Sequence, residues 1–248
     1  MRAVMAHSQW QAPVGYAMEV FETNSFDRIA AWGTASTSIP NGELWLFSDD
    51  NAAMDVVNGG GQAGPYATGL SGHRLFEHLP NVARVWINPG TKGESWVIEP
   101  RAFDITRLWA KAVKLELLLA KPDATLVQTL SEYDAYTILV LPSGGIATAV
   151  GAGGMQNPGM LFTTPDCAEA VLREIGPQAA TLKRVVVAGK QLFADFEKLG
   201  IDGFVVNPRG PGASRVLTRE ICVGIREVAK LAEEAAYYAA KAAELEGA

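Results

Sequence analysis

Short apolar runs, interrupted by polar residues, glycine and proline, predict strands and helices in alternation along this chain. Residues 44–47 and 160–162 are apolar runs with the length of buried strands. Residues 83–87 and 203–206 are rich in β-branched and aromatic side chains, which strands favour, and an Asn-Pro pair follows each of them. Because proline has no N–H to give to a neighbouring strand, we expect both strands to end there.

A helix is predicted over residues 165–175, where apolar residues recur every three or four positions. The apolar side chains on its face are Ala168, Val171, Leu172 and Ile175. Thr164 is a favoured N-cap residue and Pro165 a favoured first helical residue. Gly176 and Pro177 then form a stop signal, so the helix has a defined start and a defined end.

The two longest helices are predicted at residues 105–119, between the two halves of the chain, and at residues 220–246. The second is rich in Ala, Glu and Lys, which are strong helix formers. Its predicted apolar stripe consists of Ile221, Ile225, Val228, Leu231 and Ala235. Its last two turns carry mostly alanine together with Tyr237 and Tyr238, and we expect them to fray or to meet a partner.

The two halves of the chain repeat the same order of motifs. The matched positions are Phe47 with Phe162, Leu75 with Leu192, and Asn88 with Asn207. The spacing from Phe to Leu is 28 residues in one half and 30 in the other, and from Leu to Asn it is 13 and 15. Insertions of two residues fit loop changes between unchanged elements, so the pattern predicts an internal duplication.

Further elements extend the repeat. The additional matched pairs are helices at residues 72–79 and 189–196, which both begin with glycine, and strands at 96–98 and 215–217. Residues 136–141 form the strongest strand pattern of the chain and open the second half. Residues 30–34 are its weaker counterpart in the first half.

The repeated unit resembles the N-terminal domain of the SseB family, named for enhanced serine sensitivity. Members have an apolar run ending in Phe-Thr or Phe-Ser, then a helix, a Gly-x-x-Leu-Leu/Phe helix, and a strand closing on Asn-Pro-Gly. The matching segments here are Leu46-Phe47-Ser48, Leu161-Phe162-Thr163, the two Gly-led Leu-Phe segments, Asn88-Pro89-Gly90 and Asn207-Pro208. The second copy departs from the pattern because Arg209 precedes Gly210. The resemblance covers about residues 40–103 and 136–222, and it brings no catalytic residues with it.

The resemblance implies an α+β fold with a mixed sheet. Together with the duplication, it predicts two tandem repeats of a mixed sheet flanked by helices, related by a pseudo-twofold axis, with a long C-terminal helix. The predicted organisation is a first unit at 1–104, a connecting helix at 105–122, a second unit at 123–222 and a C-terminal helix at 223–248.

Composition excludes several classes of protein. With 48% hydrophobic residues and 19% charged residues, the chain is not largely disordered. Lys and Arg number 21 against 27 Asp and Glu, for a formal charge of −6 without a basic cluster, which argues against nucleic-acid binding. Neither a secretory signal nor an apolar run of membrane-spanning length is visible. We therefore expect a cytoplasmic protein that does not insert into membranes.

Motifs for cofactors, metals and catalysis are lacking. Residues 151–155 are glycine-rich but do not match a phosphate-binding loop, so a flexible loop is the better interpretation. His73 and His78 are five residues apart, which is not the spacing of a helical metal clamp. Cys167 and Cys222 have no histidine nearby in sequence and are expected to be reduced and buried. We expect no cofactor, no metal and no catalytic residue.

Candidate binding residues remain. Residues that could hold an anionic or amino-acid-like ligand between the repeats are Asn88, Arg101, Asn207, Arg209 and Arg215. The two Asn-Pro segments are also explained as simple turns after strands. Residues that could form a partner surface are Trp86, Trp96, Tyr237 and Tyr238.

Three functions fit the sequence. The leading one is a non-enzymatic interaction or regulatory protein that binds another protein or forms a homo-oligomer. The alternative is a sensor or enzyme for a small anionic or amino-acid-like molecule, with its site between the repeats. A role as a secretion-associated chaperone or effector is a third, weaker option that rests on family names alone.

Overall fold

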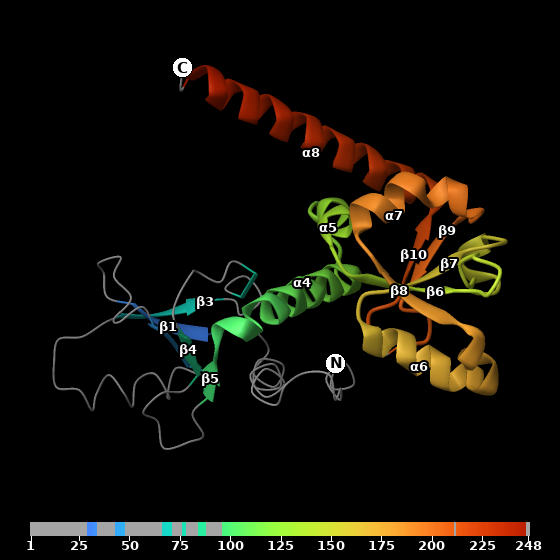
Figure 1. Ribbon diagram of the computed structural model, residues 1–248, viewed down its shortest axis with the longest axis horizontal. Coiled ribbons are helices and arrows are strands. Elements are labelled where there is room, and N and C mark those ends of the chain that lie inside the picture. Colours follow the sequence, from blue (N-terminus) through green and yellow to red (C-terminus); the bar gives the residue numbers. More distant parts are fainter. Residues whose placement is uncertain are drawn as a thin grey trace. The chain divides into compact units, whose positions relative to one another are not determined.

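The computed structural model (Figure 1) describes residues 29–33, 43–47, 66–70, 76–77, 84–87, 96–210 and 212–246. The chain divides into two compact units, Met1–Lys114 and Leu115–Ala248. Each unit contains a β-sheet, and helices accompany the sheets, which confirms the predicted α+β class. The boundary lies within α4 (Phe103–Ala120), the helix predicted at residues 105–119.

Unit 1 contains a mixed five-stranded sheet. Its strands are β1 (Ile29–Gly33), β2 (Glu43–Phe47), β3 (Tyr66–Leu70), β4 (Arg84–Ile87) and β5 (Trp96–Ile98). Their order across the sheet is β3-β1-β2-β4-β5. Strands β2 and β4 run parallel, whereas the other neighbours run antiparallel. The described interior of this sheet includes Leu46, Val85, Ile87 and Ile98, which are 0 to 1% exposed.

Unit 2 contains a second mixed five-stranded sheet. Its strands are β6 (Tyr136–Val140), β7 (Gly159–Phe162), β8 (Lys183–Val187), β9 (Gly203–Val206) and β10 (Arg215–Thr218). Their order is β8-β6-β7-β9-β10. Strands β7 and β9 run parallel and the other neighbours run antiparallel.

The two sheets share the order and the direction of their strands. Trp45 lies opposite Trp86 in unit 1, and the matched residues of unit 2, Met160 and Val205, also lie opposite each other. The register also agrees where β4 meets β5 and β9 meets β10, since Ile98 lies opposite Val85 and the matched Leu217 lies opposite Phe204. The sequence match pairs no residues of β3 with β8, and it pairs β1 with β6 only as ranges. The described strands of the two units therefore share one topology.

Helices cover both faces of the sheet in unit 2. The helices after α4 are α5 (Leu126–Glu132), α6 (Pro165–Ile175), α7 (Gly189–Asp195) and α8 (Arg219–Glu246). Short 3-10 segments occupy Pro100–Ala102, Ala152–Gly154, Gly176–Thr181 and Phe196–Leu199. Helix α6 packs on one face of the sheet, and α7 and α8 lie over the other (Figure 1).

The two faces of the sheet carry different cores. On the α6 side, Leu139, Met160 and Phe162 pack against the first turns of the helix. On the other side, the ring of Phe193 in α7 meets the rings of Tyr136 and Phe204 edge-on, at centroid distances of 6.1 and 5.7 Å. Side chains alternate between the faces of a strand, so one sheet supports both cores.

Several predicted boundaries are confirmed. Thr164 caps α6, its side chain accepting a hydrogen bond from the N–H of Cys167, and the helix ends at Gly176 with φ 73°. Strand β9 ends directly before Asn207, as the Asn-Pro pair predicts. The glycine-rich residues 151–155 form a loop with a short 3-10 turn. The predicted helix at 72–79 is described only at Phe76 and Glu77, which are helical.

Other expectations are incomplete or wrong. Strands β3 and β8 and helix α5 are not among the elements that the sequence predicted. The stripe expected for α8 is partly wrong because Ile221 and Leu231 are 38% and 64% exposed. The prediction is confirmed at Ile225, which forms the buried face of α8 together with Cys222 and Ala229.

Gly189, the glycine that opens the repeated Leu-Phe segment in unit 2, lies against the end of α5. Its N–H donates to the carbonyl oxygen of Tyr133 at 2.7 Å. A Cβ atom at this position would lie 2.5 Å from the carbonyl oxygen of Leu130 and 2.8 Å from that of Ser131. These are backbone atoms, so the start of α7 can approach α5 this closely only without a side chain.

We expect Gly189→Ala to lower the free energy of unfolding by about 1–3 kcal/mol, because the helices must separate. The matched control is Gly224→Ala in α8, where a Cβ would meet nothing within 4 Å. That change is expected to stabilise the protein by about 0.5–1 kcal/mol through helix propensity. Urea denaturation measures both, and equal stabilities for the two variants would contradict this account of α7 packing.

Candidate functional site

Polar residues gather where the two parallel strands of unit 2 end. Thr163 follows β7 and Asn207 follows β9, and the carboxyl ends of parallel strands meet at one edge of a sheet. Glu116 reaches the same place from α4. Glu116 is 6% exposed, and Thr163 and Asn207 are fully buried. In open sheets this edge is the usual place for ligands, so it is the first place to look for chemistry.

Hydrogen bonds link these three side chains and the backbone of Ala213 into one network, called the Glu116 cluster below. Oε1 of Glu116 accepts from Nδ2 of Asn207 at 2.6 Å and from the hydroxyl of Thr163. Oε2 of Glu116 accepts from the N–H of Ala213 at 2.5 Å. Oδ1 of Asn207 accepts from the N–H of Thr163 at 3.0 Å. Both carboxylate oxygens are therefore held by donors from the unit itself.

The turn after β9 bends around this network. Asn207 has φ 46° and Arg209 has φ 56°, and asparagine is among the residues that tolerate this left-handed region best. Gly212 then passes so close that a Cβ atom there would lie 2.6 Å from Oε1 of Glu116 and 2.7 Å from Nδ2 of Asn207. The chain thus closes over the carboxylate.

Two further side chains that could take part in a reaction lie beside the cluster, but burial favours the neutral form of both. Cys167, in the first turn of α6, is fully buried, and burial raises the pKa of its thiol, with the nearby Glu116 adding to the rise. The hydroxyl of Tyr133 donates to the carbonyl oxygen of Thr163 at 2.5 Å, and burial raises its pKa well above the usual range. A thiol at a helix start often serves as a nucleophile, but here burial opposes ionisation.

The second thiol lies on the opposite face of the sheet. Cys222 in α8 is fully buried, and burial raises its pKa to about 12. Its Sγ lies 3.6 Å from the carbonyl oxygen of Leu217, and both cysteines are free thiols. The expectation that both are buried is confirmed. That both are reduced stays a prediction.

The predicted ligand-binding residues of unit 2 each have a different partner. Asn207 is part of the Glu116 cluster. Arg209 points to solvent and donates to Glu174 at 2.8 Å, and Arg215 donates to the carbonyl oxygen of Leu119 at 2.9 Å. Each group therefore has its own partner within the unit.

The other two predicted ligand residues belong to unit 1. Arg101 is exposed in the 3-10 turn before α4. Asn88 lies outside the described residues. A ligand site formed by all five residues stays a prediction.

The predicted partner residues have different environments. Trp86 is half-buried in β4, and the side chain of Trp96 lies outside the described part of the structure. Tyr237 and Tyr238 are 62% and 67% exposed on α8, with their rings 5.5 Å apart. The exposed tyrosines and the nearby Leu231, 64% exposed, place large apolar side chains in water along this helix.

Sequence reasoning missed Glu116, the centre of the buried network. One signal was present: Glu116 lies between Leu115 and Leu117 in a helix, and the residues one turn away on its own face, Ala112 and Leu119, are apolar. A single carboxylate on an apolar helix face predicts a buried charge with dedicated donors. The donors are far away in sequence, so their identity was not predictable from this pattern.

The described part of the chain contains neither a metal-binding cluster nor a helix that could span a membrane. Among these residues, no group of three or more His, Cys, Asp or Glu side chains is placed to hold a metal ion. None of the helices described is long and apolar enough to cross a membrane.

Comparisons with known proteins leave the family open. No family model and no curated protein matches the chain. A solved structure, Anabaena Tic22 (protein transport), matches at 11% identity over 77% of this chain and 92% of that chain, with a TM-score of 0.24. At this identity and TM-score, the match transfers neither fold nor function. The resemblance to the SseB family stays a prediction.

We expect Glu116→Gln to lower the free energy of unfolding by about 3 kcal/mol. The amide that replaces one carboxylate oxygen then faces a donor, either Asn207 Nδ2 or the N–H of Ala213, and leaves it unpaired in the interior. The matched control is Glu132→Gln, since Glu132 is exposed, and it should change stability by less than about 0.5 kcal/mol. Urea denaturation measures both, and two equal, small effects would show that the cluster is not structural.

Proposed function

We propose that the chain is a non-enzymatic interaction or regulatory protein, built from two tandem repeats that resemble the SseB family. One contrast within unit 2 carries the proposal. The polar groups capable of chemistry are enclosed, whereas large apolar side chains stand in solvent on α8.

The enclosed groups support a structural role for the sheet edge. The carboxylate of Glu116 accepts three hydrogen bonds, and the amide of Asn207 both donates and accepts within the unit. A binding or catalytic group must instead have free capacity to reach a substrate. The thiols of Cys167 and Cys222 are buried with raised pKa values, which weakens them as nucleophiles.

The second half of α8 supports an interaction surface. Every described residue from 230 to 244 is exposed, although the helix continues to Glu246. Tyrosine and other large side chains supply much contact area at little entropic cost, and they are enriched at protein interfaces. A helix that leaves its own core with such side chains exposed gains stability when a partner covers them.

The matching sheets support the duplication. Order and direction agree at every strand pairing, and register agrees at the two pairings that contain matched residues, although those residues differ, as with Trp86 and Val205. Register is set by which face each side chain serves, so two independent sheets would rarely agree in it at their matched strands.

The test replaces three exposed residues of α8 together: Leu231→Gln, Tyr237→Gln and Tyr238→Gln. We expect loss of at least tenfold in partner binding, about 1.4 kcal/mol, with thermal stability unchanged because the side chains are exposed. The dissociation constant between the full chain and its protein partner measures this.

The matched control replaces three exposed apolar residues elsewhere in unit 2: Leu141→Gln, Val150→Gln and Val186→Gln. Binding should survive in this variant. A thermal-shift screen of anions and amino acids completes the test, because marked stabilisation by one of them would favour the ligand-sensor alternative and contradict the proposal.

A further inference from the structure

The outer face of α8 has the spacing of a coiled-coil seam. Val228, Leu231, Ala235, Tyr238 and Ala242 follow one another at alternating steps of three and four residues, and Leu245 continues the series in sequence. Leu231 and Tyr238 are 64% and 67% exposed. A seam of this type is stable only when a second helix covers it.

This seam faces away from the unit's own core. Cys222, Ile225 and Ala229 form the face of α8 that is buried in unit 2. With about 100° between successive residues, Leu231 and Tyr238 lie roughly half a turn from that face. A second helix can therefore cover the seam without displacing the packing of α8 on α5 and α7.

Side-chain sizes along the seam fit an antiparallel partner of the same sequence. Small residues alternate with large ones, and in an antiparallel pair Ala235 meets the partner's Tyr238 while Leu231 meets the partner's Ala242. Each of these layers then combines one small and one large side chain, and the outermost layers combine Val228 with the partner's Leu245. In a parallel pair, Tyr238 would meet the partner's Tyr238 and Ala235 the partner's Ala235, which leaves layers of unequal width.

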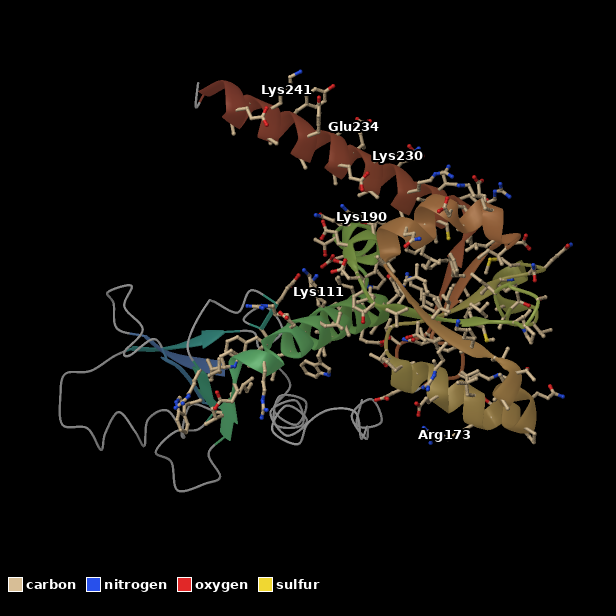
Figure 2. The ribbon with its side chains drawn as sticks, in the orientation of Figure 1. Lys111, Arg173, Lys190, Lys230, Glu234 and Lys241 are labelled. Carbon is tan, nitrogen blue, oxygen red and sulfur yellow. The ribbon has the colours of Figure 1, made fainter. Side chains whose placement is uncertain are left out.

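Charges beside the seam select the same arrangement. Glu234 and Lys241, both exposed on the outer part of α8 (Figure 2), flank the seam on one side. In the antiparallel register, Glu234 lies beside the partner's Lys241, and the symmetric pair forms as well. A shift by one heptad would set Glu234 against the partner's Glu234, and a parallel pair would set it beside the partner's Ala239. Only the first arrangement pairs opposite charges at both sites.

We propose that residues 228–245 pair with the same segment of a second copy of this chain as an antiparallel two-helix coiled coil, so that the protein is a homodimer. The proposal rests on the proposed interaction function and names the partner. The pair has fewer heptads than a long coiled coil, and its seam contains alanine, so a micromolar dimer is expected.

Sedimentation equilibrium of the full chain across the micromolar range tests the pairing. We expect Glu234→Lys and Lys241→Glu each to weaken the dimer on the order of tenfold, because each creates two like-charge contacts. The double variant should restore wild-type affinity. The control is Glu244→Lys, which makes the same charge change as Glu234→Lys but lies on an exposed position away from the seam.

A chain that stays monomeric throughout the range overturns the proposal. If the two charge reversals leave the dimer affinity unchanged, or if the double variant does not restore it, the antiparallel register is wrong. The chain could instead be monomeric and bind a different protein, with that binding lost when Leu231, Tyr237 and Tyr238 are replaced. This result overturns the homodimer and leaves the proposed function standing. The absence of both kinds of binding contradicts the proposed function as well.

Discussion

A buried carboxylate is the constraint on which unit 2 depends. Removing a charge from water costs several kcal/mol unless donors replace the lost hydration. Glu116 finds these donors in Thr163, Asn207 and Ala213, which belong to three separate segments of the chain. Satisfying one charge therefore fixes α4, the end of β7 and the turn after β9 at once. The close approach of Gly212 follows from the same requirement.

Local signals in the sequence predicted much of the fold. The N-cap at Thr164 and the Asn-Pro pair after β9 act through neighbouring residues, so their outcome is visible in the sequence. Strand β8 was missed because it is an edge strand: Lys183 and Arg184 are exposed, and no alternating pattern marks it. The Glu116 cluster was missed because its members are up to 97 residues apart, and only folding brings them together.

The buried and the exposed side chains of unit 2 differ in the roles that they can take. Groups that could react are neutral or fully hydrogen-bonded because burial penalises any other state. Apolar side chains on the outer half of α8 have no such enclosure and remain exposed. The interior of unit 2 thus serves the fold, and the exposed half of α8 is the surface that we propose for association. The two sheets share strand order and direction, with different residues at matched positions, and this likeness supports the duplication that we propose.

The central claim is that the sheet edge around Glu116 is closed structure and not a ligand site. Hydrogen–deuterium exchange of the Thr163 and Asn207 amides tests it most directly, since they donate to Oδ1 of Asn207 and to the carbonyl oxygen of Leu161. A closed core predicts exchange only through global unfolding, with an opening free energy equal to that of unfolding. Exchange of both amides through an opening several kcal/mol easier than unfolding would show that the edge opens to solvent, and would contradict the account.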